Sequence, residues 1–314
     1  WLTPAMDRLW TESPSHRRRF LDRLTLAPDP AHGTRVNRYE EALAERNRLL
    51  KEGQFDDRWL SSLEHGLATE GIAVAAARRE MVRELQGHLC ANLDPSCPHP
   101  GPPPSPSGDG GGGNIVSLHQ VEDYRDSLPR EGRSPHGGGL GWGRKERAGG
   151  QAGANHFPAP QLSLSGVENW LDDMPALLAE DRLRDELARS RRLDAAAGGT
   201  SPGPHRSDLL ATHPDKAMPA ALCSTGEQKA LLISLILAHG EIIRARRGSP
   251  PILLLDEVAA HLDETRRESL FERLLGLGGQ VFLSGADSSL FTPLKGRVLC
   301  YKIEAGFVRE TALV

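Results

Sequence analysis

The chain has 314 residues, a formal net charge of −4 and a pI near 6.3, and 33 of its residues are glycine and 23 are proline. This length allows two domains with a sizeable core, whereas the mildly acidic balance gives no general signal for nucleic-acid binding. The longest apolar run, residues 231–238, is too short to cross a bilayer, so we expect no membrane insertion.

The first part of the chain, residues 1–93, is predicted to form a helical arm or lobe. Apolar side chains recur at helical spacing from residue 13 onward, and such stripes usually face a core. The residues of these stripes are Val36, Tyr39, Leu43, Leu50, Trp59, Leu60, Leu63, Leu67, Met81 and Leu85. We expect the helices that carry them to pack in an antiparallel arm.

Charge does not mark this arm as a nucleic-acid surface. Residues 1–87 contain 14 Lys or Arg and 14 Asp or Glu, a balance of zero. Basic residues gather at positions 17–19 and again at Arg244, Arg246 and Arg247. We expect both clusters to be solvated helix faces rather than phosphate contacts.

The second part, residues 94–156, is predicted to be a flexible insertion. Glycine and proline dominate residues 101–113, and glycine dominates residues 132–153. Such a composition cannot bury enough apolar surface to offset the entropy of ordering. Two origins stay open, a true insertion and an error in the predicted gene.

The cysteines indicate a reduced protein. The four cysteines show no C-x-x-C spacing and no secretory leader precedes them, so we expect a cytoplasmic location. His88, Cys90, Cys97 and His99 lie close together, but their spacing matches no common zinc finger. We therefore expect no zinc site there.

The third part, residues 157–314, contains a strand candidate at 161–165, a helix candidate at 180–193 and then the motif Cys-Ser-Thr-Gly-Glu-Gln-Lys at 223–229. This motif opens a long apolar helix. Ser224 and Glu227 have the S-x-x-E spacing of a capping box, which satisfies free amides at a helix start. Small residues at the same place would also let backbone amides approach a phosphate. The two interpretations are compatible.

A second motif, Ile-Leu-Leu-Leu-Asp-Glu at 252–257, predicts a buried parallel strand that ends in two adjacent carboxylates. A nucleotide-hydrolysing site needs such groups for a magnesium ion and an attacking water. Asp256 would serve the metal and Glu257 would polarise the water. The alternative is a strand that simply runs into a solvated turn.

The order of the motifs carries more information than each motif alone. Ala-His-Leu-Asp follows at 260–263, then a helical segment at 264–275 and Gln-Val-Phe-Leu-Ser-Gly-Ala-Asp at 280–287. In this order they resemble the signature, Walker B and D-loop motifs of ABC-type ATPases. Further segments resemble the RecF family, and these are residues 1–7, 17–23, 39–50 and Gly-Pro-His-Arg-Ser-Asp-Leu at 203–209.

The resemblance covers about residues 1–90 and 157–314. It implies an α/β fold, the C-terminal half of an ABC/SMC-type P-loop ATPase head with an inserted helical lobe. ATP and Mg²⁺ would bind between two subunits of an ATP-dependent homodimer, where the signature of one subunit closes over the γ-phosphate held by the other.

The resemblance also assigns roles to single residues. Ser224 would supply its hydroxyl and Gly226 its backbone amide to the γ-phosphate, Asp256 would bind Mg²⁺, and Glu257 would orient water as the catalytic residue. Asp287 lies where many ABC-type heads place a switch histidine. The other residues of the implied nucleotide site are Thr225, Glu227, Gln228, His261 and Asp263.

One family motif is missing. No G-x-x-x-x-G-K-[ST] phosphate loop occurs in the sequence, although ATPases of this class need one. The nearest segment, residues 138–145, has Arg144 at the lysine position and no Ser or Thr after it. We expect this chain to be an N-terminally truncated piece that is inactive alone and belongs to an ATPase when complete.

The implied function is ATP-controlled engagement of DNA in replication, recombination and repair. RecF-like proteins work on single-stranded or gapped DNA and duplex junctions, together with RecR and RecO, and help to load RecA during gap repair and the SOS response. Two rivals stay open, a DNA-binding or scaffold module with an inactive ATPase and, disfavoured by the signature and by residues 1–90, a transporter ATPase subunit.

Overall fold

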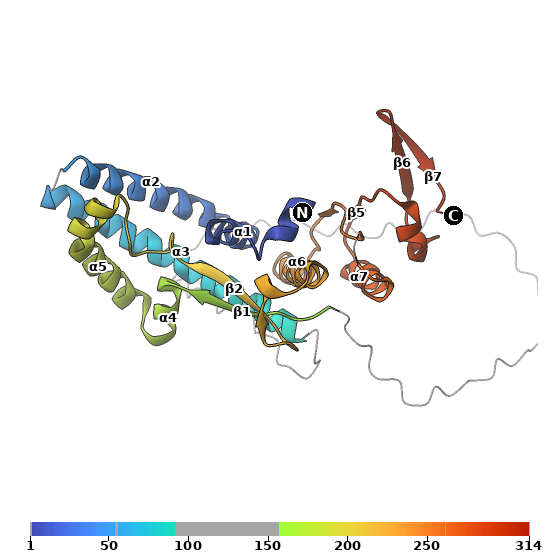
Figure 1. Cartoon of the computed structure of the whole chain (residues 1–314), viewed down its shortest axis with the longest axis horizontal. Coiled ribbons are helices and arrows are strands. Elements are labelled where there is room, and N and C mark those ends of the chain that lie inside the picture. The colour runs from blue at the N-terminus through green and yellow to red at the C-terminus, as the bar shows by residue number, and fades with distance from the viewer. Residues whose placement is uncertain (1, 54–55, 92–156, 261, 314) are drawn as a thin grey trace, which may run out of the picture. The chain divides into compact units, whose positions relative to one another are not determined.

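The computed structural model of the protein describes residues 2–53, 56–91, 157–260 and 262–313 (Figure 1). These residues belong to one compact unit of the chain. The insertion predicted at 94–156 lies outside the described residues. Among the helices of the described residues, none is both long enough and apolar enough to span a membrane.

Helices form the first part of the chain. A short 3-10 helix, η1 (Pro4–Arg8), precedes the longer helices α1 (Pro14–Leu26), α2 (Ala31–Lys51) and α3 (Asp57–Ala91). Helices α2 and α3 lie side by side, and α5 (Ala176–Ala197) packs on both (Figure 1). The predicted stripes are confirmed at Tyr39, Leu60 and Leu85, which are buried. Trp59 is an exception with 48% exposure, because its neighbour Leu60 takes the inward position and adjacent helical residues point about 100° apart.

The strands of the described residues form three small sheets. The first is antiparallel in the order β1 (Gln161–Ser165), β2 (Asp208–His213) and β3 (Met218–Pro219). The second pairs β4 (Leu253–Leu255) in parallel with β5 (Val281–Leu283). The third is the antiparallel hairpin of β6 (Cys300–Glu304) and β7 (Phe307–Thr311). The strand predicted at 161–165 is β1. Short helices lie between these elements, and they are η2 (Val167–Asn169), α4 (Trp170–Asp173), η3 (Ala220–Leu222) and η4 (Ser288–Leu294).

Helix α6 (Thr225–Arg247) is the centre of the largest hydrophobic core. Its apolar residues are buried on nearly every side, and Leu231 and Leu235 have no exposed surface. Side chains of α1, α3 and α7 (Glu264–Leu277) surround it, among them Phe271. The predicted long apolar helix is therefore confirmed, and so is the helix predicted after the D-loop.

Strand β4 is parallel to β5, as predicted, but it is only half buried. Leu253 and Leu255 are 5% and 4% exposed, whereas Leu254 between them is 49% exposed. Alternate residues of a strand point to opposite faces, so one face packs on the core while the other carries Leu254 and Phe282 outward. The predicted parallel strand is therefore confirmed, and its predicted burial is confirmed for one face only.

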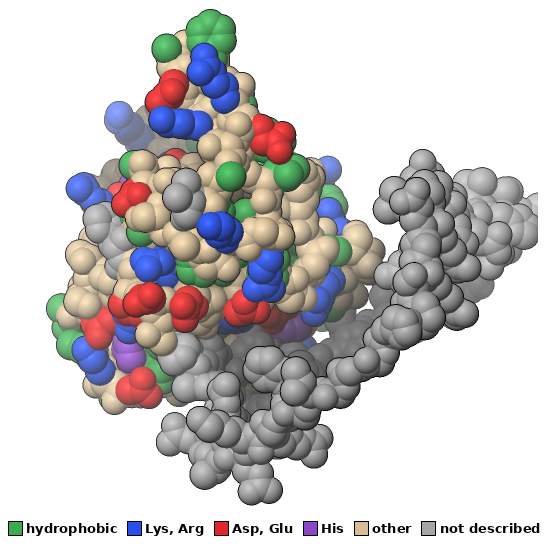
Figure 2. Space-filling view, turned by 90° about the vertical axis from the view of Figure 1, so that its right-hand side faces the viewer, with side chains coloured by type: hydrophobic (Ala, Val, Ile, Leu, Met, Phe, Trp, Pro, Cys, Tyr) green, Lys and Arg blue, Asp and Glu red, His purple; other side chains and the backbone are tan. Residues whose placement is uncertain are grey.

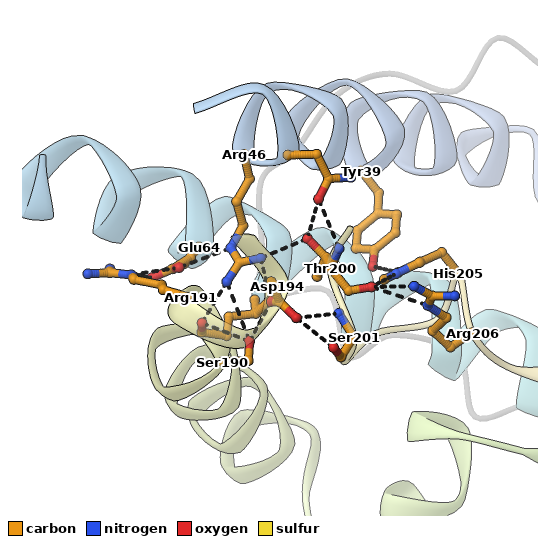
Figure 3. A network of polar contacts seen from close by, with 12 residues as sticks. Tyr39, Arg46, Glu64, Ser190, Arg191, Asp194, Thr200, Ser201, His205 and Arg206 are labelled. Carbon is orange, nitrogen blue, oxygen red and sulfur yellow. Dashed lines mark hydrogen bonds and ion pairs between the residues drawn. The ribbon is translucent and has the colours of Figure 1, made fainter. Parts of the chain in front are cut away.

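A buried polar network fastens α2 to α3, to α5 and to the residues that follow α5 (Figure 3). The guanidinium of Arg46 has no exposed surface. Its Nε donates to Oε1 of Glu64 at 3.0 Å, and its Nη1 donates to Oδ2 of Asp194 at 2.8 Å and to Oγ1 of Thr200 at 2.7 Å. Buried charges are tolerated when they are paired and hydrogen-bonded in this way.

The same network reaches the Gly-Pro-His-Arg-Ser-Asp-Leu segment through Thr200, and Tyr39 joins it there (Figure 3). The hydroxyl of Tyr39 lies 2.6 Å from Nδ1 of His205, and Nε2 of His205 lies 2.9 Å from the carbonyl oxygen of Thr200. A carbonyl only accepts, so Nε2 carries the proton and Nδ1 accepts from Tyr39. Burial lowers the pKa of His205 to about 4, which keeps the ring neutral. Gly203 has a φ of 135°, and a side chain there would collide with Tyr39.

Candidate functional site

The signature motif begins with a complete capping box. Ser224 precedes α6 in an extended conformation, and its Oγ accepts a hydrogen bond from the backbone N of Glu227 at 3.4 Å. The backbone N of Ser224 in turn donates to Oε2 of Glu227 at 3.0 Å. The predicted cap is confirmed, and Ser224 and Thr225 lie exposed at the positive end of the helix.

Glu227 and Gln228 brace this helix start from two sides. Oε1 of Glu227 accepts from Nζ of Lys216 at 2.5 Å, and this bond, followed by the bonds of the capping box, lowers the pKa of Glu227 to about 2. Gln228 is buried, and its Nε2 donates to the carbonyl oxygens of Cys223 at 2.9 Å and Ala221 at 3.3 Å. The Gln228 amide therefore shapes the turn that positions Ser224.

The two carboxylates of the Walker B motif follow directly after β4. Asp256 is exposed, and its Oδ1 accepts a hydrogen bond from Oγ of Ser284, the first residue after β5. Glu257 is half-buried and follows in a left-handed backbone conformation. Because β4 and β5 are parallel, their carboxyl ends meet at one edge, which is where ligands bind in open α/β sheets.

The remaining predicted residues have local partners. Asp263 caps α7, with its Oδ1 accepting from the backbone N of Arg266 at 2.8 Å. Asp287 caps η4 in the same manner, and the bond from the backbone N of Ser289, at 2.9 Å, lowers its pKa. Both aspartates are exposed. His261 lies outside the described residues.

One side chain joins the two main motifs. Lys229, on the first turn of α6, donates from Nζ to the carbonyl oxygen of Glu257 at 2.9 Å. Within the described part of the chain, no hydrogen bond connects Ser224 itself to Asp256 or Glu257. The signature end of α6 and the Walker B carboxylates are thus neighbours through Lys229, while the exposed face of Ser224 stays available.

Sequence reasoning missed Lys229 and Ser284. A signal for Lys229 was present, because it directly precedes the apolar run 230–233, and a charged side chain that is buried beside such a run needs a partner. Ser284 offered a weaker signal, its place at the end of the strand after Walker B.

One exposed carboxylate at the edge of β4 and β5, that of Asp256, is of a kind that binds magnesium. Among the described residues, no group of three or more His, Cys, Asp or Glu side chains is arranged to hold a metal. Mg²⁺ does not require such a group, since it usually binds one or two carboxylates together with substrate phosphates and keeps several waters. The exposed Asp256 carboxylate belongs to that donor set, and the Ser284 hydroxyl donates a hydrogen bond to it.

The basic clusters are partly tied into the protein. Nε and Nη2 of Arg17 donate to the two carboxylate oxygens of Asp208 at 2.7 and 2.8 Å, and the Arg17 side chain is only 12% exposed. The expectation of a solvated face was therefore wrong for Arg17, although Arg19 is exposed. Arg246 lies at the surface and pairs with Glu84. On the face drawn in Figure 2, basic and acidic side chains are interspersed.

Comparison with known proteins places this chain in a family. A scan against models of protein families gave no match. The chain is 43% identical over 306 residues to the DNA replication and repair protein RecF of Allorhizobium ampelinum, 41% over 308 residues to that of Rhizobium etli strain CIAT 652 and 42% over 312 residues to that of Mesorhizobium japonicum. These alignments cover 98–99% of this chain and 66–67% of each relative.

Two solved structures share the fold. They are titled as the recombination mediator protein RecF in the RecFOR pathway, bound to ATPrS in one case and to ATP in the other. Their TM-scores are 0.66 and 0.65 at 19% and 20% sequence identity. The match covers 99% of this chain and 67% and 66% of theirs.

Proposed function

The chain belongs to the RecF family of DNA replication and repair proteins, and on that basis we propose that it supplies the signature and Walker B half of an ATP-controlled recombination mediator. It has the ABC/SMC-type ATPase fold of the RecF structures and spans about two thirds of the length of its relatives. The observation that carries the proposal is the direct bond from Lys229, at the signature end of α6, to Glu257 after β4.

At the start of α6, Ser224 would donate its hydroxyl and Gly226 its backbone amide to the γ-phosphate of ATP bound by a second subunit. The positive end of the helix adds a favourable field for that charge. Thr225 is exposed beside Ser224, whereas Gln228 acts indirectly by holding the preceding turn. Glu227 keeps the cap closed and stays ionised because of Lys216.

At the edge of β4 and β5, Asp256 would hold Mg²⁺, which neutralises charge on the transferred phosphate. Glu257 would orient the attacking water in line with the γ-phosphate. His261 and Asp263 would lie at the interface of the homodimer, and Asp287 would take the place of the switch histidine. Hydrolysis would therefore require two copies of the complete protein.

The proposed role of this cycle is controlled release of DNA. ATP would close the dimer on single-stranded or gapped DNA or on a duplex junction, and hydrolysis would open it. RecR and RecO-like mediators and RecA are the proposed partners, in gap repair and the SOS response within the cytoplasm. Residues 1–93 would serve as a helical contact lobe and residues 157–314 as the ATPase part.

The test uses a completed protein, in which the part of the Allorhizobium ampelinum relative that this chain does not cover is joined to it. We expect ATP turnover that depends on Glu257, so Glu257→Gln should lower kcat by about 10²–10⁴-fold, the usual contribution of a positioned general base. The same variant should accumulate as an ATP-bound dimer on gapped DNA, seen by light scattering and fluorescence anisotropy.

Glu268→Gln is the matched control, because Glu268 is an exposed glutamate on α7. It should leave kcat unchanged. Hydrolysis by Glu257→Gln at the unmutated rate would remove Glu257 from the mechanism. A completed protein that binds DNA with no ATP turnover would instead favour a scaffold with an inactive ATPase.

A further inference from the structure

The backbone of Glu257 is held in a conformation that a residue with a side chain rarely adopts. Its φ is 53°, in the left-handed region. For a residue with a Cβ atom this region is disfavoured, and such residues persist only where the surroundings fix them. Contacts on both sides of the Glu257 backbone hold this geometry.

Ser284 holds the amide side of this residue. The backbone N of Glu257 donates to Oγ of Ser284 at 3.2 Å, and the same hydroxyl donates to Oδ1 of Asp256. One hydroxyl can accept one bond and donate another at the same time. The backbone N of Ser284 also donates to the carbonyl oxygen of Leu255 at 3.0 Å, which fixes the hydroxyl against the end of β4.

Lys229 holds the carbonyl side. Its Nζ lies 2.9 Å from the carbonyl oxygen of Glu257 and 3.4 Å from Oδ2 of Asp7 in η1. Lys229 is 4% exposed, so its ammonium group depends on these partners for the hydrogen bonds that water would otherwise supply. The lysine follows Gln228 on the first turn of α6 and thus ties the helix start to Glu257.

We propose that Lys229 and Ser284 form a clamp that positions the Glu257 carboxylate for water activation, and that this clamp couples the signature end of α6 to the catalytic glutamate. The inference rests on the proposed function for its catalytic consequence. The clamp itself is a property of the 314-residue chain. Both residues act through Glu257 and neither is assigned a contact with ATP.

The first test measures the clamp in the chain as it stands. Amide hydrogen exchange at Glu257 should be about tenfold faster in Ser284→Ala, since the net value of one hydrogen bond corresponds to roughly that factor. Ser284→Thr keeps the hydroxyl and should restore slow exchange. Ser284 is exposed, so these variants should fold. Equal exchange in Ser284→Ala and the unmutated chain would overturn the clamp.

The second test measures the consequence in the completed protein. Lys229→Met and Ser284→Ala should each lower kcat by about tenfold while KM for ATP stays within about twofold, because the lost contact acts on the catalytic step rather than on binding. When Glu257→Gln is already present, the same substitutions should change the residual kcat by less than about twofold. The effects of substitutions at contacting residues that act as a unit do not add.

If Lys229→Met and Ser284→Ala lowered kcat by the same factor with and without Glu257→Gln, or changed only KM, the positioning role would be overturned. The proposed function would survive that result. Loss of the Glu257→Gln effect itself would overturn the proposed function and leave the exchange result standing. If Lys229→Met fails to fold, the comparison of Ser284→Ala with Ser284→Thr decides the inference alone.

Discussion

Glu257 combines a strained backbone with a proposed chemical role. Its left-handed backbone, with a φ of 53°, is unfavourable for any residue other than glycine or, less strongly, asparagine and aspartate. A glutamate is therefore kept at this position at a cost in stability. The clamp of Lys229 and Ser284 explains how the conformation persists.

This strain predicts the relative stability of two substitutions in the 314-residue chain. Glu257→Gly should be more stable than Glu257→Ala by about 0.5–1 kcal/mol, because both remove the side chain and only glycine relaxes the left-handed strain. Thermal and urea unfolding measure the difference. An alanine variant as stable as the glycine variant would mean that the backbone at Glu257 is not strained.

Among the elements, α2, α3 and α5 depend on one another through Arg46 (Figure 3). Arg46 and its partners on α5 are more than a hundred positions apart in the sequence, and its Nη2 also donates to the carbonyl oxygen of Leu187 on α5 at 2.6 Å. The apolar contacts around Tyr39 and Leu183 pack the same three helices. The polar network therefore fixes how the helices align, in addition to the apolar packing that brings them together.

Arg46→Met should destabilise the chain by about 3–5 kcal/mol, since it removes the cation paired with the buried Asp194 and leaves Glu64 with Arg191 alone. Arg48→Met is the matched control, two residues along α2. The ion pairs of Arg48 with Glu45 and Glu52 are at the surface, so removing them should barely change the free energy of unfolding. Denaturant unfolding compares the two, and equal losses would contradict the structural role of Arg46.

For the whole molecule, the exposed start of α6 is the place where a second copy is proposed to bind. Ser224 has two candidate roles there, the observed helix cap and the proposed contact to the partner's phosphate. Replacing Ser224 with aspartate separates the two roles. Aspartate caps a helix about as well as serine, but its charge repels a phosphate.

Ser224→Asp in the completed protein should melt within about 1 kcal/mol of the unmutated protein yet stay monomeric in ATP. Light scattering with and without ATP measures the oligomeric state. Ser13→Asp is the control, because Ser13 is the N-cap of α1 and has no assigned role in the nucleotide site. Normal ATP-dependent dimerisation of Ser224→Asp would leave Ser224 as a helix cap only.

The local patterns of the sequence predicted the start of α6, the strand before Asp256 and the helix after the D-loop. Each depends on contacts a few residues apart or on a periodic apolar run, and both kinds of signal are visible in the sequence. The order of these motifs also gave the family. The assignment of single residues to ATP and Mg²⁺ remains a prediction.

The tertiary structure decided which side chains are covered and which distant residues contact one another. Periodicity could not reveal that Leu254 points outward, because whether an apolar strand is covered on one face or two depends on distant elements. Nor could it pair Arg17 with Asp208, 191 positions away, or Lys229 with Glu257, 28 positions away. Buried charges are matched by three-dimensional proximity, and only the packing of α1 on β2 and of α6 beside β4 creates that proximity.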